Sequence, residues 1–185
     1  STTTCPLPAY PNVSCTGVLA GTTLSTYNGD YEAGAGAVIT NMRITGDVRI
    51  NGPGVVIRNS EIYGEVKNRT AGHNFTIEDS TIGPPSGCPG SAAIGHSNFT
   101  LRRVYLRNFG DGIRIGDGAG SAGSNVGIYD SFIKLCDPGG DAHSDGIQGY
   151  GGGANVRIEH NTVDQRAVPE ARVTSPFLRA RLYGK

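Results

Sequence analysis

A pattern that recurs six times is the feature that most constrains how this chain can fold. Each copy reads apolar, any residue, Ile or Leu, any residue, a bend residue that is usually Asn or Asp, a small residue, any residue, and Ile, Leu or Val. The copies occupy residues 37–44, 55–62, 75–82, 99–106, 126–133 and 156–163. Their central apolar residues are separated by 18, 20, 24, 27 and 30 residues. A unit of about this length repeated along a chain is typical of a solenoid.

The pattern also predicts the local structure of each repeat. Side chains alternate across a strand, so apolar residues at positions i and i+2 face the same side. The polar bend shifts this alternation, and the next apolar residue then points inward again. We therefore predict a strand, a bend and a second strand in each repeat, with coils stacked about 4.8 Å apart. The rising spacing predicts that one connecting loop lengthens while the strands are kept. An irregular β-sandwich is the alternative.

A second ladder of apolar residues occurs once per coil, beside glycine-rich corners. Its members are Val48, Val66, Ile94, Ile113 and Ile147. Alternation turns the residues that follow them outward, and these are Arg49, Lys67, Gly95, Arg114 and Gln148. The residues two positions before the ladder are Gly46, Gly64, Ala92, Asp111 and Asp145. The stretches 110–114 and 144–148 are therefore expected to be the same element on adjacent coils.

These ladders predict an all-β fold, a single-stranded parallel β-helix of about six to seven coils. We expect an N-terminal cap over residues 1–36, coils over 37–165 and a C-terminal cap or tail over 166–185. The proline-rich start is expected to close the first coil, because an open sheet edge invites aggregation.

The four cysteines form no Cys-x-x-Cys pair, which favours disulfides over a metal site. Four cysteines allow three pairings, of which we expect Cys5 with Cys15 and Cys88 with Cys136. This pairing goes with a secreted protein, and the alternative is reduced thiols in a cytosolic protein.

The 16 basic and 16 acidic residues balance, which argues against a protein that binds nucleic acid by neutralising phosphates. The apolar stretches are too short for a transmembrane helix. We expect a monomer that binds neither nucleic acid nor membrane.

The ladders, the polar bend and the stretch from His143 to Gln148 together resemble the pectate lyase-like superfamily of right-handed parallel β-helices. Residues 13–24 resemble the opening of its secreted bacterial members. The resemblance covers about residues 12–165 and implies a right-handed, exported, carbohydrate-active protein. That superfamily holds polysaccharide lyases, polygalacturonase-type hydrolases, phage tailspikes and uncharacterised carbohydrate-active proteins, so the resemblance does not choose the reaction.

Candidate catalytic residues lie in the polar stretch before the last ladder member. Asp145 matches the aspartate of the Thr-Asp-Gly element of polygalacturonase-like enzymes, although His143-Ser144 stands where Asn-Thr is usual. Asp111, one coil earlier, would lie about 5 Å away, and two carboxylates so close could form an acid–base pair. His143 is the candidate base, since imidazole titrates near neutrality. Asp-Gly is also a common turn pair, so both aspartates are alternatively turn residues.

Candidate ligands of a substrate and a metal lie beside these residues. Arg49, Lys67 and Arg114 form an outward cationic strip, extended by Gln148, that suits an acidic polysaccharide, and Tyr150 could stack on a sugar. Asp137 and Asp141, with Asp145, offer oxygen ligands for calcium, which is the one candidate cofactor. His160 falls in the bend column beside Asp130 and Arg103, where we expect a structural role.

The expected function is that of a secreted polysaccharide lyase that cleaves a uronate-containing polymer by β-elimination. Arg114 and Lys67 would neutralise the uronate carboxylate, His143 would abstract the proton, and Asp145 would orient His143 or bind the metal. One alternative is an inverting glycoside hydrolase that uses Asp145 and Asp111. The other is a non-catalytic carbohydrate-binding or adhesion module.

Overall fold

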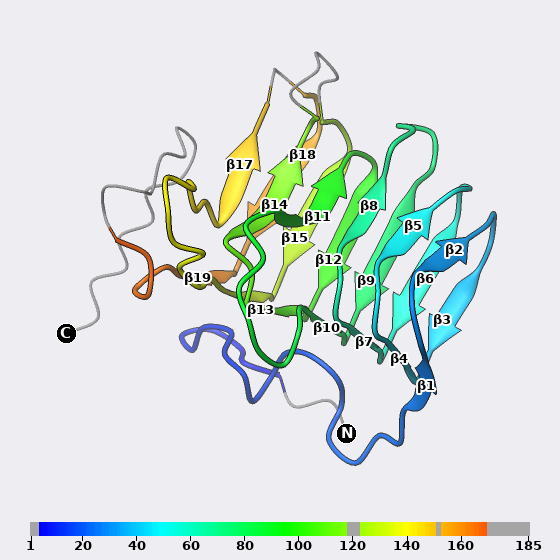
Figure 1. Cartoon of the computed structure of the whole chain (residues 1–185), viewed down its shortest axis with the longest axis horizontal. Coiled ribbons are helices and arrows are strands. Elements are labelled where there is room, and N and C mark those ends of the chain that lie inside the picture. The colour runs from blue at the N-terminus through cyan, green and yellow to red at the C-terminus, as the bar shows by residue number, and fades with distance from the viewer. Residues whose placement is uncertain (1–3, 118–122, 151–152, 170–185) are drawn as a thin grey trace.

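The computed structural model describes residues 4–117, 123–150 and 153–169, and in them every regular element is a β-strand. The strands form three parallel sheets that run the length of the molecule (Figure 1). Sheet A contains Ser25–Tyr27 (β1), Met42–Ile44 (β4), Glu61–Ile62 (β7), Thr81–Ile82 (β10), Tyr105–Arg107 (β13), Phe132–Lys134 (β16) and Thr162–Asp164 (β19). Sheet B contains Tyr31–Ala33 (β2), Val48–Ile50 (β5), Val66–Asn68 (β8), Ala92–His96 (β11), Asp111–Ile115 (β14) and Ile147–Gly149 (β17). Sheet C contains Val38–Thr40 (β3), Val55–Arg58 (β6), Phe75–Glu78 (β9), Phe99–Arg102 (β12), Val126–Tyr129 (β15) and Val156–Glu159 (β18).

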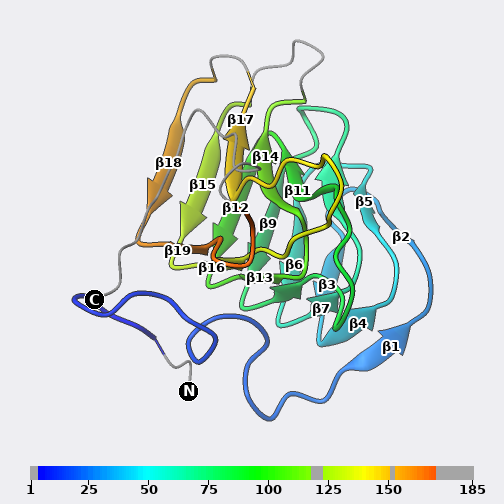
Figure 2. The same cartoon turned by 60° about the vertical axis from the view of Figure 1, so that its left-hand side comes forward.

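Each coil contributes one strand to each sheet, and every pairing joins a strand to its equivalent on the neighbouring coil. This is the arrangement of a parallel β-helix, as the repeated pattern predicts, and Figure 2 shows the coils stacked behind one another. The parallel pairing begins at Ser25, where β1 pairs with β4, so the first coil starts inside the range 1–36 that was expected to be a cap. No helix in the described part of the chain has the length and apolar character needed to cross a membrane.

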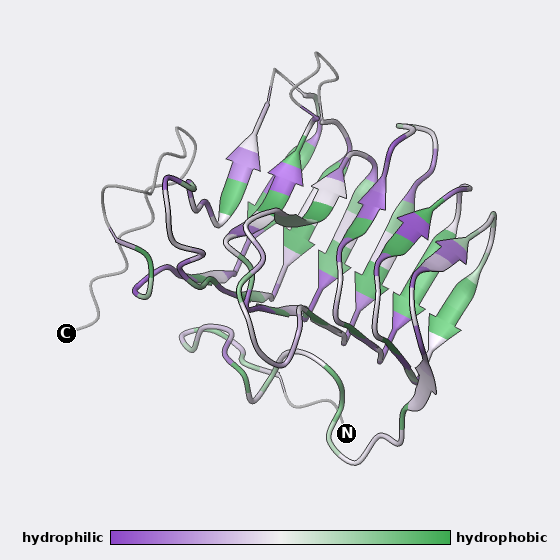
Figure 3. Ribbon diagram, in the orientation of Figure 1, coloured by the Kyte–Doolittle hydropathy of each residue, from purple (hydrophilic) through white to green (hydrophobic). Residues whose placement is uncertain are grey.

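The inward positions of the three sheets form continuous apolar columns. In sheet C, Ile39 aligns with Ile57, Ile57 with Ile77, and Ile77 with Leu101. All four side chains are fully buried. Phe75 and Phe99 stack with their ring centroids 5.3 Å apart. Apolar and polar residues alternate along the strands in Figure 3, as expected where one face is buried and the other is in water. The predicted ladders are therefore confirmed as the core except in the last repeat, where Val156 is exposed and Ile158 is only partly buried.

The tight corner between sheets C and A is built from residues with left-handed backbone. One residue per coil, with φ between 46° and 53°, occupies this corner, and together we call them the corner column: Asn41, Asn59, Asp79, Arg103, Asp130 and His160. Asn and Asp adopt this conformation more readily than other non-glycine residues, which explains why the bend position favours them. The later members depart from this preference with an arginine and a histidine.

Neighbours in the corner column bond to each other in complementary pairs. Asn59 Nδ2 donates to Asn41 Oδ1 at 2.7 Å. The guanidinium of Arg103 donates to both carboxylate oxygens of Asp79, at 2.6 and 2.9 Å. The third pair is Asp130 with His160. The prediction that His160 lies beside Asp130 in this column is confirmed, and Nδ1 is 2.7 Å from Asp130 Oδ1.

Buried serines follow three members of the corner column and connect successive coils. The Ser60 amide donates to Ser80 Oγ at 3.1 Å, and the Met42 amide donates to Ser60 Oγ at 3.2 Å. Ser80 Oγ in turn donates to the Glu78 carbonyl at 2.7 Å. Each hydroxyl therefore satisfies a backbone amide that the bend removes from the strand ladder.

Replacing Ser80 by alanine is expected to lower the free energy of unfolding by about 1–3 kcal/mol, because the buried Ser60 amide loses its acceptor. The control is Ser25→Ala, in which the lost hydroxyl is exposed and donates to the Asn41 carbonyl at 3.4 Å. That change is expected to stay within about 0.5 kcal/mol. Denaturant unfolding of both variants measures the difference, and equal losses would contradict the role assigned to the buried hydroxyl.

The connecting segments lengthen at two corners, which corrects the prediction that a single loop grows. Between sheets A and B, nine residues separate the end of β10 at Ile82 from the start of β11 at Ala92, and a long segment precedes β17. Between sheets B and C, the segments after β8, β14 and β17 are the long ones. The corner between sheets C and A keeps one or two residues in every coil. Sheet B is thus the sheet with long connections on both sides.

Both expected disulfides are present. Cys88, in the segment before β11, is bonded to Cys136, in the segment before β17. Cys5 is bonded to Cys15 within the N-terminal segment.

Residues 4–24, which we call the N-terminal strap, lie along the side of the solenoid. The Gly17 amide donates to the Arg103 carbonyl at 2.9 Å, and the Leu19 amide donates to Asn59 Oδ1 at 2.9 Å. The strap thus follows the corner column beneath sheet A, as Figures 1 and 2 show, rather than covering the first coil from above. Only residues 166–169 of the predicted C-terminal cap or tail lie within the described part of the chain.

Candidate functional site

The outward column of sheet B holds the residues that were expected to bind a substrate. Arg49 aligns with Lys67, Lys67 with Gly95, Gly95 with Arg114, and Arg114 with Gln148. The predicted alignment of these five residues on adjacent coils is confirmed. Two coils separate Lys67 from Arg114, which corresponds to about 10 Å along the sheet. Gly95 contributes no side chain between them.

Carboxylates that sequence reasoning missed accompany the cations of this column. Arg49 forms ion pairs with Asp30 at 2.7 Å and Glu32 at 2.8 Å. Lys67 Nζ lies 2.6 Å from Glu65 Oε2. The sequence carried a signal for two of these residues, because Glu65 precedes Lys67 by two positions on the same strand face and Glu32 aligns with Arg49. The column is therefore a row of ion pairs, not a strip of unpaired cations.

Arg114 has the most elaborate surroundings in this column. Its Nη2 donates to Asp111 Oδ2 at 3.1 Å, and its guanidinium carbon lies 5.4 Å from the centre of the Tyr150 ring. Arg114 Nε and the Oε1 of the adjacent Gln148 are both buried and have no hydrogen-bond partner among the residues that the structure describes. Four predicted site residues thus come together here, and we call Asp111, Arg114, Gln148 and Tyr150 the Arg114 cluster.

The two unpartnered atoms have complementary hydrogen-bonding capacity. Arg114 Nε can only donate and Gln148 Oε1 can only accept. A buried polar atom without a partner costs about 1–3 kcal/mol, so such atoms commonly mark the place of a ligand or an ordered water. A sugar carboxylate beside a sugar hydroxyl would offer an acceptor to Arg114 and a donor to Gln148.

Asp111 and Asp145 lie together, as their positions on adjacent coils predict. The Asp145 amide donates to Asp111 Oδ1 at 3.0 Å, so both oxygens of Asp111 accept hydrogen bonds. The Asp145 side chain is 1% exposed. Burial, aided by the nearby charge of Asp145, raises the pKa of Asp111 above its ordinary value, against the opposing effects of the Asp145 amide and Arg114. Asp111 is therefore engaged in joining two coils and in holding Arg114.

The remaining predicted residues lie in the segment between β16 and β17. His143, Asp137 and Asp141 are all exposed there. Asp137 Oδ1 accepts a hydrogen bond from the Gly139 amide at 2.9 Å. In the described ranges, no group of three His, Cys, Asp or Glu side chains is arranged to hold a metal ion. The aspartates therefore do not converge on a calcium site.

Comparison with protein-family models finds no match to this chain, and comparison with curated proteins and with solved structures finds none either.

Proposed function

We propose that this protein is a secreted, carbohydrate-active β-helix that binds a uronate-containing polysaccharide along the outer face of sheet B and cleaves it by β-elimination. The observation that carries the proposal is the pair of buried polar atoms on Arg114 and Gln148 that have no hydrogen-bond partner within the described part of the chain. Long connecting segments flank this face on both sides, and loops on a regular scaffold are where binding residues commonly lie. We further propose right-handed coiling, membership of the pectate lyase-like superfamily and action as a monomer.

Arg114 is the residue that we assign to the uronate carboxylate. Its guanidinium is held on one side by Asp111 and faces the Tyr150 ring on another, so its orientation is fixed before a ligand arrives. A guanidinium can donate two parallel hydrogen bonds to a carboxylate, and an aromatic ring offers a sugar an apolar surface. Lys67, two coils away, would contact a neighbouring uronate of the same chain.

β-Elimination follows from neutralising that carboxylate. The charge of Arg114 makes the proton on the adjacent carbon more acidic, and His143 is the base assigned to remove it. The electron pair of the broken C–H bond forms the new C=C bond. The C–O bond to the next sugar then breaks, and the leaving oxygen takes up a proton from water. Because Asp137, Asp141 and Asp145 do not converge, no step is assigned to calcium.

The second candidate function is carbohydrate binding without cleavage. The ion pairs of Arg49 and Lys67 favour it, since their charges are already balanced by carboxylates. Inverting hydrolysis by Asp111 and Asp145 has less support. That mechanism needs two carboxyl groups with a water molecule between them, whereas Asp111 is buried and doubly hydrogen-bonded and Asp145 is buried.

Secretion is proposed from the two disulfides, which are typical of an oxidising compartment. The described part of the chain has no free cysteine.

An activity screen tests the proposed reaction. The protein is incubated with polyuronates and with neutral polysaccharides, with added calcium and with chelator, while unsaturated product absorbance and new reducing ends are followed in parallel. Both signals on a polyuronate are the expected result. Binding of a polyuronate with neither signal would favour the second candidate, and reducing ends alone would favour hydrolysis. If no acidic polymer is bound or cleaved, the proposed function is wrong.

A further inference from the structure

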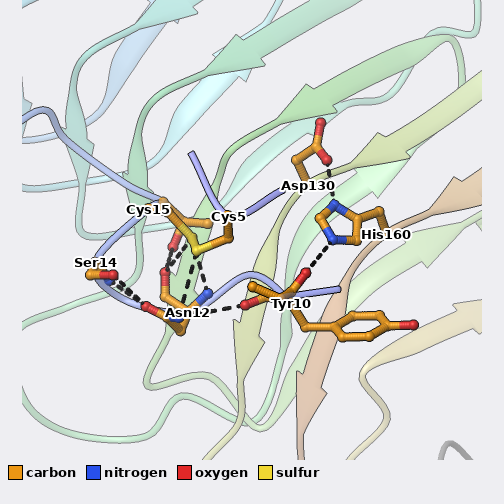
Figure 4. Close-up of a disulfide and its surroundings, with 9 residues drawn as sticks. Cys5, Tyr10, Asn12, Ser14, Cys15, Asp130 and His160 are labelled. Carbon is orange, nitrogen blue, oxygen red and sulfur yellow. Dashed lines mark hydrogen bonds and ion pairs between the residues drawn. A yellow bond between two sulfur atoms is a disulfide. The ribbon is translucent and has the colours of Figure 1, made fainter. Parts of the chain in front are cut away.

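His160 joins the last coil of the solenoid to the N-terminal strap. Its Nδ1 lies 2.7 Å from Asp130 Oδ1 in the preceding coil, and its Nε2 lies 2.8 Å from the backbone carbonyl of Ala9. The ring of Tyr10 lies against the imidazole, with centroids 5.3 Å apart. Figure 4 shows the imidazole between Asp130 on one side and the strap on the other.

Both partners of the imidazole are hydrogen-bond acceptors, and this fixes the protonation state that fits the site. A carboxylate and a carbonyl can only accept, so both ring nitrogens must donate. Neutral imidazole carries one N–H and can satisfy one of the two, whereas the imidazolium cation satisfies both. The contact between the strap and the last coil therefore depends on a proton that His160 can lose.

The charged groups around His160 support the cationic form. Asp130 is its nearest charge, and the next member of the corner column, Arg103, has its charge balanced by Asp79. Arg102 Nη1 lies 3.9 Å from the other carboxylate oxygen of Asp130. From the strap, the facing groups are the Ala9 carbonyl and the Tyr10 ring. The hydrogen bond to Asp130, and then that to Ala9, raise the pKa of His160 above its ordinary value of 6.5.

The part of the strap held by His160 is a small closed unit. The Cys5–Cys15 disulfide closes it, and the Gly17 and Leu19 amides fix the chain that follows. A pocket of about 370 Å³ lies between this unit and the corner column. Its walls include Cys5 and Cys15 on the strap, and Arg103, Asp130 and His160 on the solenoid. Moving the disulfide-closed unit away would open this pocket.

We propose that His160 is a proton-dependent latch, which holds the disulfide-closed unit of the strap on the last coil when it is protonated and releases it when it is neutral. Release frees the Ala9 carbonyl, separates Tyr10 from the imidazole and opens the pocket beside Arg103 and Asp130. The contacts of Gly17 and Leu19 do not involve a titrating side chain, so the remainder of the strap stays attached. The latch is independent of the Arg114 cluster, which lies on a different sheet.

The direction of the pH dependence follows from the raised pKa. Folding with the latch closed favours the protonated imidazole, so its stabilisation is fully present below the ordinary value of 6.5. The stabilisation is lost as the pH rises through the higher pKa of the folded protein. The latch is thus closed in acid and open in base.

Two measurements on the whole protein test the latch. The titration of the His160 ring is followed by NMR, and the protection of residues 5–15 against amide hydrogen exchange is measured over the same pH range. Protection is corrected for the intrinsic exchange rate and compared with that of β12 inside the solenoid. We expect residues 5–15 to lose protection with the same midpoint as the His160 titration, while β12 keeps it. Different midpoints, or pH-independent protection of residues 5–15, would overturn the proposal.

Two variants separate the latch from a merely structural contact. His160→Asn introduces the residue that occupies the same corner in two other coils and tolerates its backbone. It is expected to abolish the pH dependence of protection in residues 5–15. Asp130→Asn keeps the shape of the partner but removes its charge, so the His160 titration and the loss of protection should both shift to lower pH. The latch is also wrong if His160→Asn keeps the wild-type pH dependence, or if Asp130→Asn shifts the titration without the protection.

Discussion

Replacing Arg114 by methionine is expected to lower kcat/KM on a polyuronate by roughly 10- to 100-fold. A hydrogen bond to a charged group contributes about 1.5–3 kcal/mol, and the variant loses the proposed bond to the uronate carboxylate. Arg114→Lys keeps the charge but not the planar pair of donors, so we expect an intermediate loss. Initial rates over a range of polymer concentrations measure both effects.

The control for this prediction is Arg58→Met. Arg58 lies on β6 in sheet C, where it is exposed and pairs with Glu78 at 3.5 Å. The substitution removes one positive charge from the outer face of sheet C instead of sheet B, and it is expected to leave the rate unchanged. Because the Arg114 variants also remove a partner of the buried Asp111, circular dichroism and thermal unfolding must show that they remain folded. Normal turnover by folded Arg114→Met would place the binding site elsewhere.

Removing the Cys88–Cys136 disulfide by a pair of serine substitutions is expected to cost about 4 kcal/mol in the free energy of unfolding. The bond closes a loop with a sequence separation of 48, and the cost follows from the greater freedom of the unfolded chain. The bridge also joins the segment before β11 to the segment before β17, and the Cys136 amide donates to the intervening Phe109 carbonyl at 3.1 Å. It therefore holds three successive coils beside sheet B.

The matched comparison is the corresponding pair of substitutions at Cys5 and Cys15, whose separation is 10. The same relation gives about 3 kcal/mol for that loop. Because both cysteines of a pair are replaced, neither double variant has a free thiol. Denaturant unfolding of the two variants gives the difference in their free energies of unfolding. A larger loss of stability on removal of the N-terminal disulfide would contradict the prediction. The Cys88–Cys136 bond, which joins three coils, would then not be the more stabilising of the two.

The core of this fold could be predicted from the sequence because its rules are local. Alternation along a strand placed Ile39, Ile57 and Ile77 on one inward column, and the polar bend marked the tight corner. The first coil was missed because β1, Ser25–Tyr27, is exposed throughout and carries no apolar alternation. The path of the strap rests on contacts such as that of Ala9 with His160, which are separated by 151 residues and leave no local signal.

The positions of the candidate site residues could be predicted from the sequence, but their ion pairs could not. Register alone aligned Arg114 with Gln148, and position on the next coil brought Asp111 and Asp145 together. The pairing of Arg114 with Asp111 joins residues three apart in a strand, which ordinary alternation places on opposite faces. The alternation along a strand therefore does not predict this contact, which is seen only in the folded structure.

The corner column also bears on how faithfully the coils assemble. The apolar interior repeats nearly the same side chains at each level, so a strand displaced by one whole coil would still find an apolar surface to cover. The corner column does not repeat in this way, because its neighbours are matched as amide with amide, carboxylate with guanidinium, and carboxylate with imidazole. Stacking with one level skipped would set Asp130 beside Asp79 and His160 beside Arg103, so that like charges would lie together. These pairs therefore favour the stacking of each coil on its correct neighbour during folding.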